Sequence, residues 1–181
     1  SVFHIDYESY NLSARYLSYL LTPATVCLAV PLYQQLSLLK KHARAILAGT
    51  VTGVLTTMAT VLVLALLFGL THEQYVTFLP KSITTAIGMG VSEEMGGIVT
   101  ITVACIIITG IIGNIIAETV CRLFHITEPV AKGIAIGSAS HAIGTTKAME
   151  MGEVEGAMSS LAIAVSGLCT VLFASVFANF L

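Results

Sequence analysis

Hydroxyl and ionisable side chains gather in one short stretch of a chain that is otherwise largely apolar. This stretch contains Ser138, Ser140, His141, Thr145, Thr146 and Lys147. A second stretch, residues 80–97, carries a similar set: Lys81, Ser82, Thr84 and Thr85. Hydroxyl groups, an imidazole and free N–H groups at a helix start can bind the oxygens of a small carboxylate, and the helix dipole favours its charge. We therefore expect an anion-binding site lined by both stretches.

The two stretches are related by an internal repeat with a constant offset of 56 residues. Seven of the fifteen residues 82–96 are identical to their counterparts in residues 138–152, including Ala-Ile-Gly and Glu-Met-Gly. A long uncharged segment follows each copy. Paired segments interrupted by glycine at corresponding positions are typical of the binding site of a transporter.

The composition explains where such segments must lie. The 181 residues are 56% hydrophobic and only 10% charged, with a mean hydropathy of +0.92. A soluble domain carries about 25% charged residues, so the chain is predicted to be an integral membrane protein. The net charge of −2 excludes the basic surface that nucleic-acid binding requires.

Three uncharged runs are long enough to cross a bilayer as helices: residues 45–71, 95–117 and 156–181. A fourth run, residues 12–39, is interrupted by an arginine and two prolines and predicts a broken crossing. The fold class that follows is all-α: a polytopic helical membrane protein forming a single membrane domain over residues 1–181.

The repeat motifs, residues 80–97 and 136–156, are too polar and too rich in glycine for helices that face lipid. Irregular backbone at membrane depth requires surrounding protein or a water-filled cavity, so we expect two broken helices or re-entrant hairpins. Lys40, Lys41 and Arg44 place the start of the first long helix on the cytoplasmic side. This orientation favours an inverted pair of motifs that meet near the membrane midplane, although two parallel crossings stay open.

Each polar residue also has a structural interpretation. Ser and Thr in membrane helices often bond to carbonyl groups or to a neighbouring helix, and Lys81 could simply reach the lipid interface. An ionisable group at membrane depth usually faces a cavity, so for His141 we favour contact with substrate or a proton. Asn114 is predicted to make an interhelical hydrogen bond, and Gly49-x-x-x-Gly53 and Gly133-x-x-x-Gly137 to be packing faces.

The acidic residues and the absence of known catalytic motifs bear on whether the chain is an enzyme. Glu93, Glu94, Glu150, Glu153 and Glu155 are expected at solvated hairpin ends. The sequence contains no catalytic triad, metal-ligand cluster, P-loop or dinucleotide fingerprint, so we expect neither an enzyme nor a bound metal or cofactor.

Three blocks of sequence resemble the LrgB/CidB family of bacterial membrane proteins. Residues 126–170 (ITEPVAKGIAIGSASHAIGTTKAMEMGEVEGAMSSLAIAVSGLCT) resemble its C-terminal signature, and LTPATVCLAVPLYQQL and LPKSITTAIGMGVSEEMGGI match two further blocks. Family members usually begin with additional N-terminal membrane segments. They usually have Pro in place of Ala86 and Asn-Gly in place of Ser166-Gly167.

The resemblance implies two functions. The family was first described as modulating murein hydrolase activity and autolysis beside a smaller holin-like partner, LrgA/CidA. Other members resemble components of pyruvate transport, and a plastid relative joins both parts as a glycolate/glycerate translocator. By resemblance the site residues would be Ser82, Thr84, Thr85, Ser138, Ser140, His141, Thr145 and Thr146, with Lys81 as a further candidate.

Our leading hypothesis from the sequence is a carrier of small monocarboxylates or 2-hydroxy acids, such as pyruvate, glycolate, glycerate or lactate. The alternative is a holin-like regulator of murein hydrolase export and autolysis that acts with an LrgA/CidA-type partner. In both cases we expect a homo- or hetero-oligomer in the bacterial inner (plasma) membrane. Its partners would be the lipid bilayer and, for a carrier, a small carboxylate anion.

Overall fold

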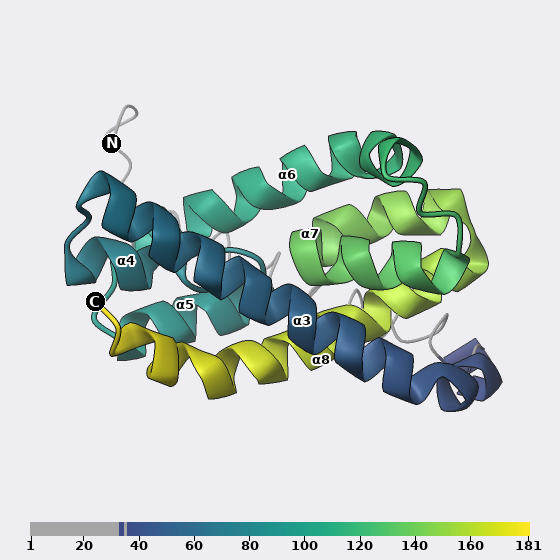
Figure 1. Ribbon diagram of the computed structural model, residues 1–181, viewed down its shortest axis with the longest axis horizontal. Helices are drawn as coiled ribbons and strands as arrows, with labels where there is room; N and C mark the ends of the chain where they lie inside the picture. The colour runs from purple at the N-terminus through teal and green to yellow at the C-terminus, as the bar shows by residue number, and fades with distance from the viewer. Residues whose placement is uncertain (1–32, 35) are drawn as a thin grey trace, which may run out of the picture.

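The computed structural model describes residues 33, 34 and 36–181, and this part of the chain is all-α. Within the described residues six helices follow one another (Figure 1): α3 (Leu36–Phe68), α4 (His72–Phe78), α5 (Thr85–Glu94), α6 (Val99–Leu123), α7 (Pro129–Met151) and α8 (Glu153–Ala178). The predicted all-α class is confirmed. The predicted broken crossing over residues 12–39 lies mostly outside the described residues.

Three of these helices are long and apolar enough to cross a membrane: Lys40–Phe68 within α3, Val99–Leu123 and Glu153–Ala178. They match the three uncharged runs with shifted ends. The first helix stops at Phe68 because Gly69 takes a φ of +62°, which favours glycine. The last helix begins at Glu153 rather than residue 156, since carboxylates in a first turn stabilise the positive end of the helix dipole.

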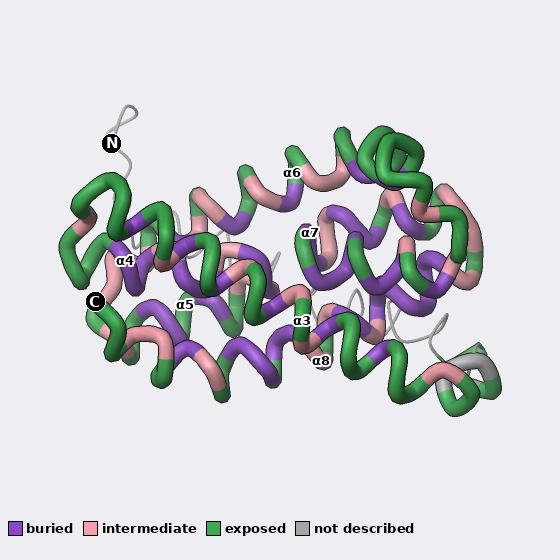
Figure 2. The backbone as a smooth tube through the Cα atoms, viewed as in Figure 1, coloured by how far each residue is buried: buried purple, intermediate pink, exposed green. Residues whose placement is uncertain are grey.

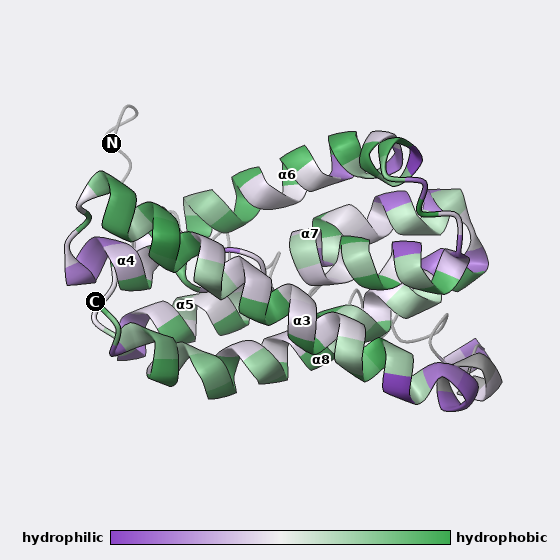
Figure 3. Cartoon of the chain, in the orientation of Figure 1, coloured by the Kyte–Doolittle hydropathy of each residue, from purple (hydrophilic) through white to green (hydrophobic). Residues whose placement is uncertain are grey.

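The outward faces of the long helices are apolar. Ile115 on α6 and Leu168 on α8 are each 70% exposed. Buried residues lie where the helices face one another (Figure 2), and polar residues gather near the two ends of the molecule (Figure 3). Such a surface fits a lipid bilayer, with the charged ends outside its hydrocarbon core.

Helices α4 and α5 form a short helical hairpin, which we call the first hairpin. Thr71 caps α4 through a capping box with Gln74. After the turn at residues 79–84, Thr84 has an extended backbone and α5 starts at Thr85. The Tyr75 hydroxyl donates to the carbonyl of Phe177 at 2.9 Å, which fastens this hairpin to the end of α8.

Helix α7 forms the second hairpin, because it is broken at His141. This residue has φ 42° and ψ −143°, so the chain folds back and residues 142–151 return beside residues 129–140 (Figure 1). A Cβ atom on Gly144 would lie 3.2 Å from Ile136 on the other arm. Ile136 also shares an apolar cluster with Ala148, a contact that a straight helix would not allow.

The two hairpins enter from opposite ends of the molecule. The first opens toward the end where α3 stops and α6 begins, and the second toward the end where α6 stops and α8 begins (Figure 1). The helix that follows each turn starts at Thr85 in the first hairpin and directly after His141 in the second. Thr85 and His141 correspond under the offset of 56 residues, so the two helices start within one residue of each other in the repeat.

Glycines allow the helices to approach closely, as the sequence predicts. A Cβ on Gly49 would lie 3.3 Å from Ile134, and a Cβ on Gly53 would lie 3.1 Å from the Ser138 hydroxyl. These two glycines therefore let α3 pack closely against α7. On the other side of α7, a Cβ on Gly133 or Gly137 would collide with backbone carbonyls of α8. Both Gly-x-x-x-Gly patterns are therefore packing faces.

Candidate functional site

The tips of the two hairpins meet at one small cavity near the middle of the molecule. Ser82 from the first hairpin and Ser138 from the second line it together with Thr57 of α3 and Thr170 of α8. Its volume is about 10 Å³, close to the minimum of roughly 10–15 Å³ that one water needs. The cavity fits a single oxygen atom in this conformation and is too small for a whole organic acid.

Ser82 and Ser138 use their hydroxyl groups differently. Ser82 is 6% exposed and accepts a hydrogen bond from the Lys81 ammonium at 3.0 Å, which leaves its own proton free. Ser138, also buried, donates to the carbonyl of Ile134 at 2.7 Å. A positive charge therefore lies one residue from the tip cavity.

His141 is buried and bridges two helices. Its ring is 3% exposed, and Nε2 lies 2.8 Å from the carbonyl oxygen of Ile106 on α6. A carbonyl oxygen can only accept, so Nε2 carries the proton. Gly110 makes room for the ring, because a Cβ there would lie 2.7 Å from Cε1.

The remaining hydroxyls of the second hairpin mostly connect helices. Thr145 is fully buried; it lies 2.9 Å from the His141 carbonyl, to which it donates, and 2.7 Å from the Ser159 hydroxyl of α8. Ser140 is buried against Gly113 of α6. Thr146 is exposed and accepts from the Asn114 amide at 2.8 Å.

The same Asn114 amide donates to the Ile143 carbonyl at 2.8 Å, so the predicted interhelical hydrogen bond of Asn114 is confirmed. Thr84 and Thr85 are half-buried at the start of α5, and Thr84 makes no side-chain capping bond there. The structure thus brings Ser82 and Ser138 together at the tips, with Lys81 bonded to Ser82. It directs His141, Thr145 and Thr146 toward α6 and α8 instead.

A groove reaches Ser138 from the side. It has a volume of about 610 Å³ and lies between α3 and the first arm of α7. Small residues form much of its lining, among them Gly49, Gly53, Ala131, Ala135 and Ala139. Ser138 lines both this groove and the tip cavity, so it lies between the two spaces.

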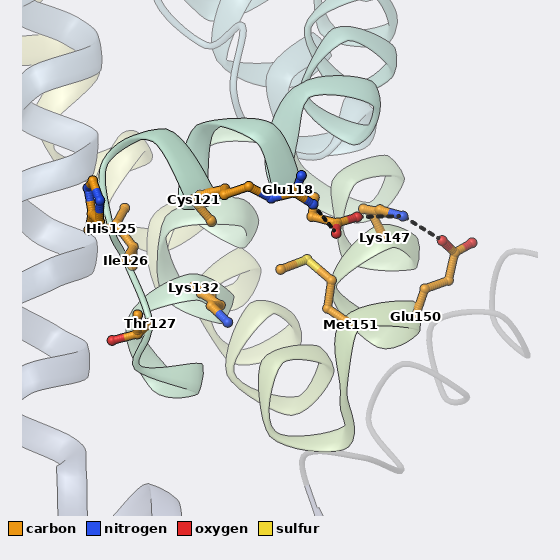
Figure 4. Close-up of a pocket in the computed structure, with 10 residues that line it drawn as sticks. Glu118, Cys121, His125, Ile126, Thr127, Lys132, Lys147, Glu150 and Met151 are labelled. Atoms are coloured by element: carbon orange, nitrogen blue, oxygen red, sulfur yellow. Dashed lines mark hydrogen bonds and ion pairs between the residues drawn. The ribbon is translucent and has the colours of Figure 1, made fainter.

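A charged pocket of about 670 Å³ lies at the open end of the second hairpin (Figure 4). Lys147 lies 3.1 Å from Glu150 and 3.6 Å from Glu118, which also pairs with Arg122 at 3.1 Å. The hydrogen bond to Glu150 raises the pKa of Lys147. This network connects the end of α6 to the second arm of α7.

One acidic residue departs from the sequence prediction. Glu93, Glu94, Glu150 and Glu153 are exposed as expected, whereas Glu155 is only 8% exposed. Its carboxylate lies 3.9 Å from the ammonium of Lys132, because the close packing of α7 on α8 brings the two together. The expectation that Glu155 is solvated is wrong.

Sequence reasoning missed Thr57 and Thr170. Both lie in long apolar helices outside the repeat motifs, where a threonine usually bonds to its own helix backbone. No spacing in the sequence connects them to Ser82 and Ser138. Only the packing of α3 and α8 around the hairpin tips places these two residues at the cavity.

The long apolar helices and the opposed hairpins define a polytopic helical membrane protein with a small cavity at its centre. Four hydroxyl residues line this cavity together with four apolar ones, Val54, Met58, Leu79 and Ile83. A model of the LrgB-like family matches residues 1–180, and the chain belongs to this family. It is a membrane protein by both criteria.

Two groups of bacterial proteins are similar to nearly the whole chain. The chain is 39% identical over 171 residues to the uncharacterized protein YxaC of Bacillus subtilis, which covers 94% of this chain and 73% of that protein. It is 37% identical over 178 residues to the antiholin-like protein LrgB of Bacillus mycoides, covering 98% of this chain and 77% of the relative. The protein of the same name from Bacillus cereus gives the same values. No solved structure matches the chain.

Proposed function

We propose that this chain is an antiholin-like protein of the bacterial plasma membrane. In this role it controls the export of murein hydrolases and autolysis together with a smaller LrgA/CidA-type membrane partner. The observation that carries the proposal is the likeness to proteins named antiholin-like protein LrgB, at 37% identity over 98% of the chain. The wide apolar faces of α6 and α8, with Ile115 and Leu168 70% exposed, offer the lateral contact that such a partner needs.

A lysis assay tests this function. The chain is expressed in a bacterium that lacks its own LrgB-type protein, with and without an LrgA-type partner, and detergent-induced lysis and secreted murein hydrolase activity are measured. We expect slower lysis and weaker hydrolase bands on a zymogram when both proteins are present. An unrelated membrane protein at matched expression serves as the control. Equal lysis in all strains would contradict the proposal.

A second candidate function is a carrier for small monocarboxylates or 2-hydroxy acids, and the geometry of the hairpins favours it. Two hairpins that enter from opposite ends and meet at Ser82 and Ser138 fit an inverted repeat with its site at the midplane. The helices that start at Thr85 and after His141 would direct their positive ends toward the centre, where they favour an anion. Lys81 would add a full positive charge.

Transport is tested with proteoliposomes that contain the purified chain, alone or with its partner. Uptake of labelled pyruvate, glycolate and lactate is measured after imposing a gradient. We expect saturable uptake of at least one acid and a large loss in Ser82→Ala and Ser138→Ala. Thr60→Val is the control, since Thr60 is exposed and donates to its own helix at Thr56. Uptake no faster than in empty liposomes would exclude the carrier function.

A further inference from the structure

We propose that Thr57 and Thr170 complete the site at the hairpin tips, where their hydroxyls donate hydrogen bonds to one oxygen of a carboxylate ligand. This inference rests on the carrier function proposed above and adds two residues from outside the repeat motifs. It would make the site a four-sided cage, with one hydroxyl each from α3, the first hairpin, the second hairpin and α8.

The hydroxyl groups around the cavity have protons to donate. Thr170 is 3% exposed, lines the cavity and makes no hydrogen bond to any residue that the structure describes. Thr57 lines the same cavity and likewise has no hydrogen-bond partner among the described residues. Ser82 accepts from Lys81, so its proton is also available.

The other threonines of these helices and hairpins follow two patterns: some, such as the buried Thr50 of α3, also lack a hydrogen-bond partner among the described residues, and others bond to their own helix. Thr60, Thr77 and Thr145 each donate to the carbonyl four residues earlier in the chain, the usual arrangement in helices. A buried hydroxyl that does not make this bond has no partner within its helix, and an unpaired buried hydroxyl lowers the stability of the fold. An oxygen bound in the cavity that Thr170 lines would supply the acceptor that the described residues do not.

The balance of donors and acceptors identifies the ligand chemistry. Thr57, Thr170 and Ser82 each have a free proton, the Lys81 ammonium bonds to Ser82, and only Ser138 has already used its proton, on Ile134. Three donors and a nearby positive charge suit an oxygen with several lone pairs and a negative charge. A carboxylate oxygen meets this description, whereas an ammonium group or a metal cation would meet Lys81 as a like charge.

The size of the cavity restricts how the ligand binds. About 10 Å³ accommodates one oxygen atom, so the rest of an acid would need the hairpin tips to separate. If the tips separate, the cavity would open beside the groove that reaches Ser138 from the side. The cage would hold the charged oxygen in the same way for each acid, and the remainder of the molecule would lie in the space opened by the hairpins.

The test is an isosteric exchange, Thr170→Val, which removes the hydroxyl and keeps the shape. We expect the KM for uptake of the labelled acid by proteoliposomes to rise roughly ten- to a hundredfold, the usual effect of losing one hydrogen bond to a charged oxygen. Thr57→Val should act in the same direction, and Thr170→Ser should restore most of the affinity. Thr60→Val is the matched control and should leave KM unchanged.

A second measurement separates binding from folding. Melting temperature in detergent is recorded with and without the acid that the wild type transports. The acid should stabilise the wild type and Thr60→Val, but not Thr170→Val. If Thr170→Val does not fold, Thr57→Val and Thr170→Ser are compared in its place.

The outcomes distinguish the two proposals. If the wild type transports an acid and both valine variants keep its KM and its thermal shift, the cage is wrong while the carrier function stands. If the wild type neither transports nor binds any of the acids, the carrier function is wrong and the cage is overturned with it.

Discussion

His141 combines an unusual backbone with a buried polar contact. Its φ of 42° lies in a region that side chains other than glycine seldom adopt, and its ring reaches the Ile106 carbonyl on α6. The turn of the second hairpin is thereby fastened to the neighbouring helix. A structural role for His141 in packing is compatible with a functional role in binding substrate or a proton. A hairpin that carries a binding site must also be held in place.

We predict that His141→Ala destabilises the protein through the lost interhelical hydrogen bond, by about 1–3 kcal/mol. Gly110→Ala should have a similar effect, because its new Cβ would displace the ring. The two losses share one contact, so the double variant should cost clearly less than their sum. Reversible unfolding in mixed micelles measures this, and strict additivity would show that the ring and Gly110 act independently.

A separate prediction concerns the function of His141 in uptake. If the ring contacts substrate or a proton, His141→Ala abolishes uptake per folded molecule, while His141→Gln retains a donor that cannot titrate. Comparing uptake by the two variants separates binding from proton coupling. Unchanged uptake per folded molecule in both variants would leave only the packing role.

The sequence predicted some residue roles better than others, for physical reasons. Asn114 was predictable, because an amide in an apolar helix must find a partner. The burial of Glu155 was not, because its partner Lys132 comes from another helix and only the close approach of α7 and α8 brings them together. Thr57 and Thr170 gave no signal, since threonine is common in membrane helices.

At the scale of elements, the repeat predicted that the second motif is interrupted but not where. The motif contains four candidate glycines, and the break falls instead on His141, the counterpart of Thr85 where α5 starts. Glycines of α7 have another purpose: Gly137 of the motif, together with Gly133 just before it, brings α7 against the backbone of α8. The ends of the long helices shifted because caps and turns, rather than hydropathy, set them.

We predict that Gly137→Ala destabilises the protein by at least 1–3 kcal/mol, the usual order for overpacking. Its Cβ would collide with the backbone of Ser159, which cannot move aside as a flexible side chain can. Gly90→Ala is the matched control: no atom lies within 4 Å of its added Cβ, and alanine favours a helix by about 0.5–1 kcal/mol. Melting temperatures of the purified variants compare the two. Equal melting temperatures would contradict the packing described for α7 and α8.

At the scale of the whole molecule, the basic residues of the described chain are concentrated at one end, where some of them pair with glutamates such as Glu118, Glu150 and Glu155. Six basic residues gather at the end where α3 begins, α6 stops and the second hairpin opens (Figures 1 and 3): Lys40, Lys41, Arg44, Arg122, Lys132 and Lys147. Glu73, Glu93 and Glu94 lie toward the opposite end. Basic residues favour the cytoplasmic side, so the second hairpin should open to the cytoplasm.

This orientation predicts the sidedness of labelling. In a variant without its native cysteines, His125→Cys should react with a membrane-impermeant maleimide only in inside-out vesicles. Glu93→Cys should react in intact cells. Both positions are exposed, so differences in reactivity report the side of the membrane. The reverse labelling pattern would contradict this orientation, and the side of the membrane assigned to each hairpin would then be wrong.

The carrier function and the site at the hairpin tips depend on an architecture in which the two hairpins enter from opposite sides and meet at Ser82 and Ser138. The most direct test is cross-linking of Ser82→Cys with Ser138→Cys in native membranes, in the cysteine-free background with a protease site inserted at residues 124–128. After treatment with a short bifunctional thiol reagent and proteolysis, the two fragments should stay joined until reductant is added. Ser82→Cys with Glu153→Cys, whose second cysteine lies at the exposed first residue of α8, about 25 Å along the helix from Thr170, should give separate fragments. If the Ser82–Ser138 pair also separates, although each single cysteine reacts with the reagent, the hairpins do not meet and the account is contradicted.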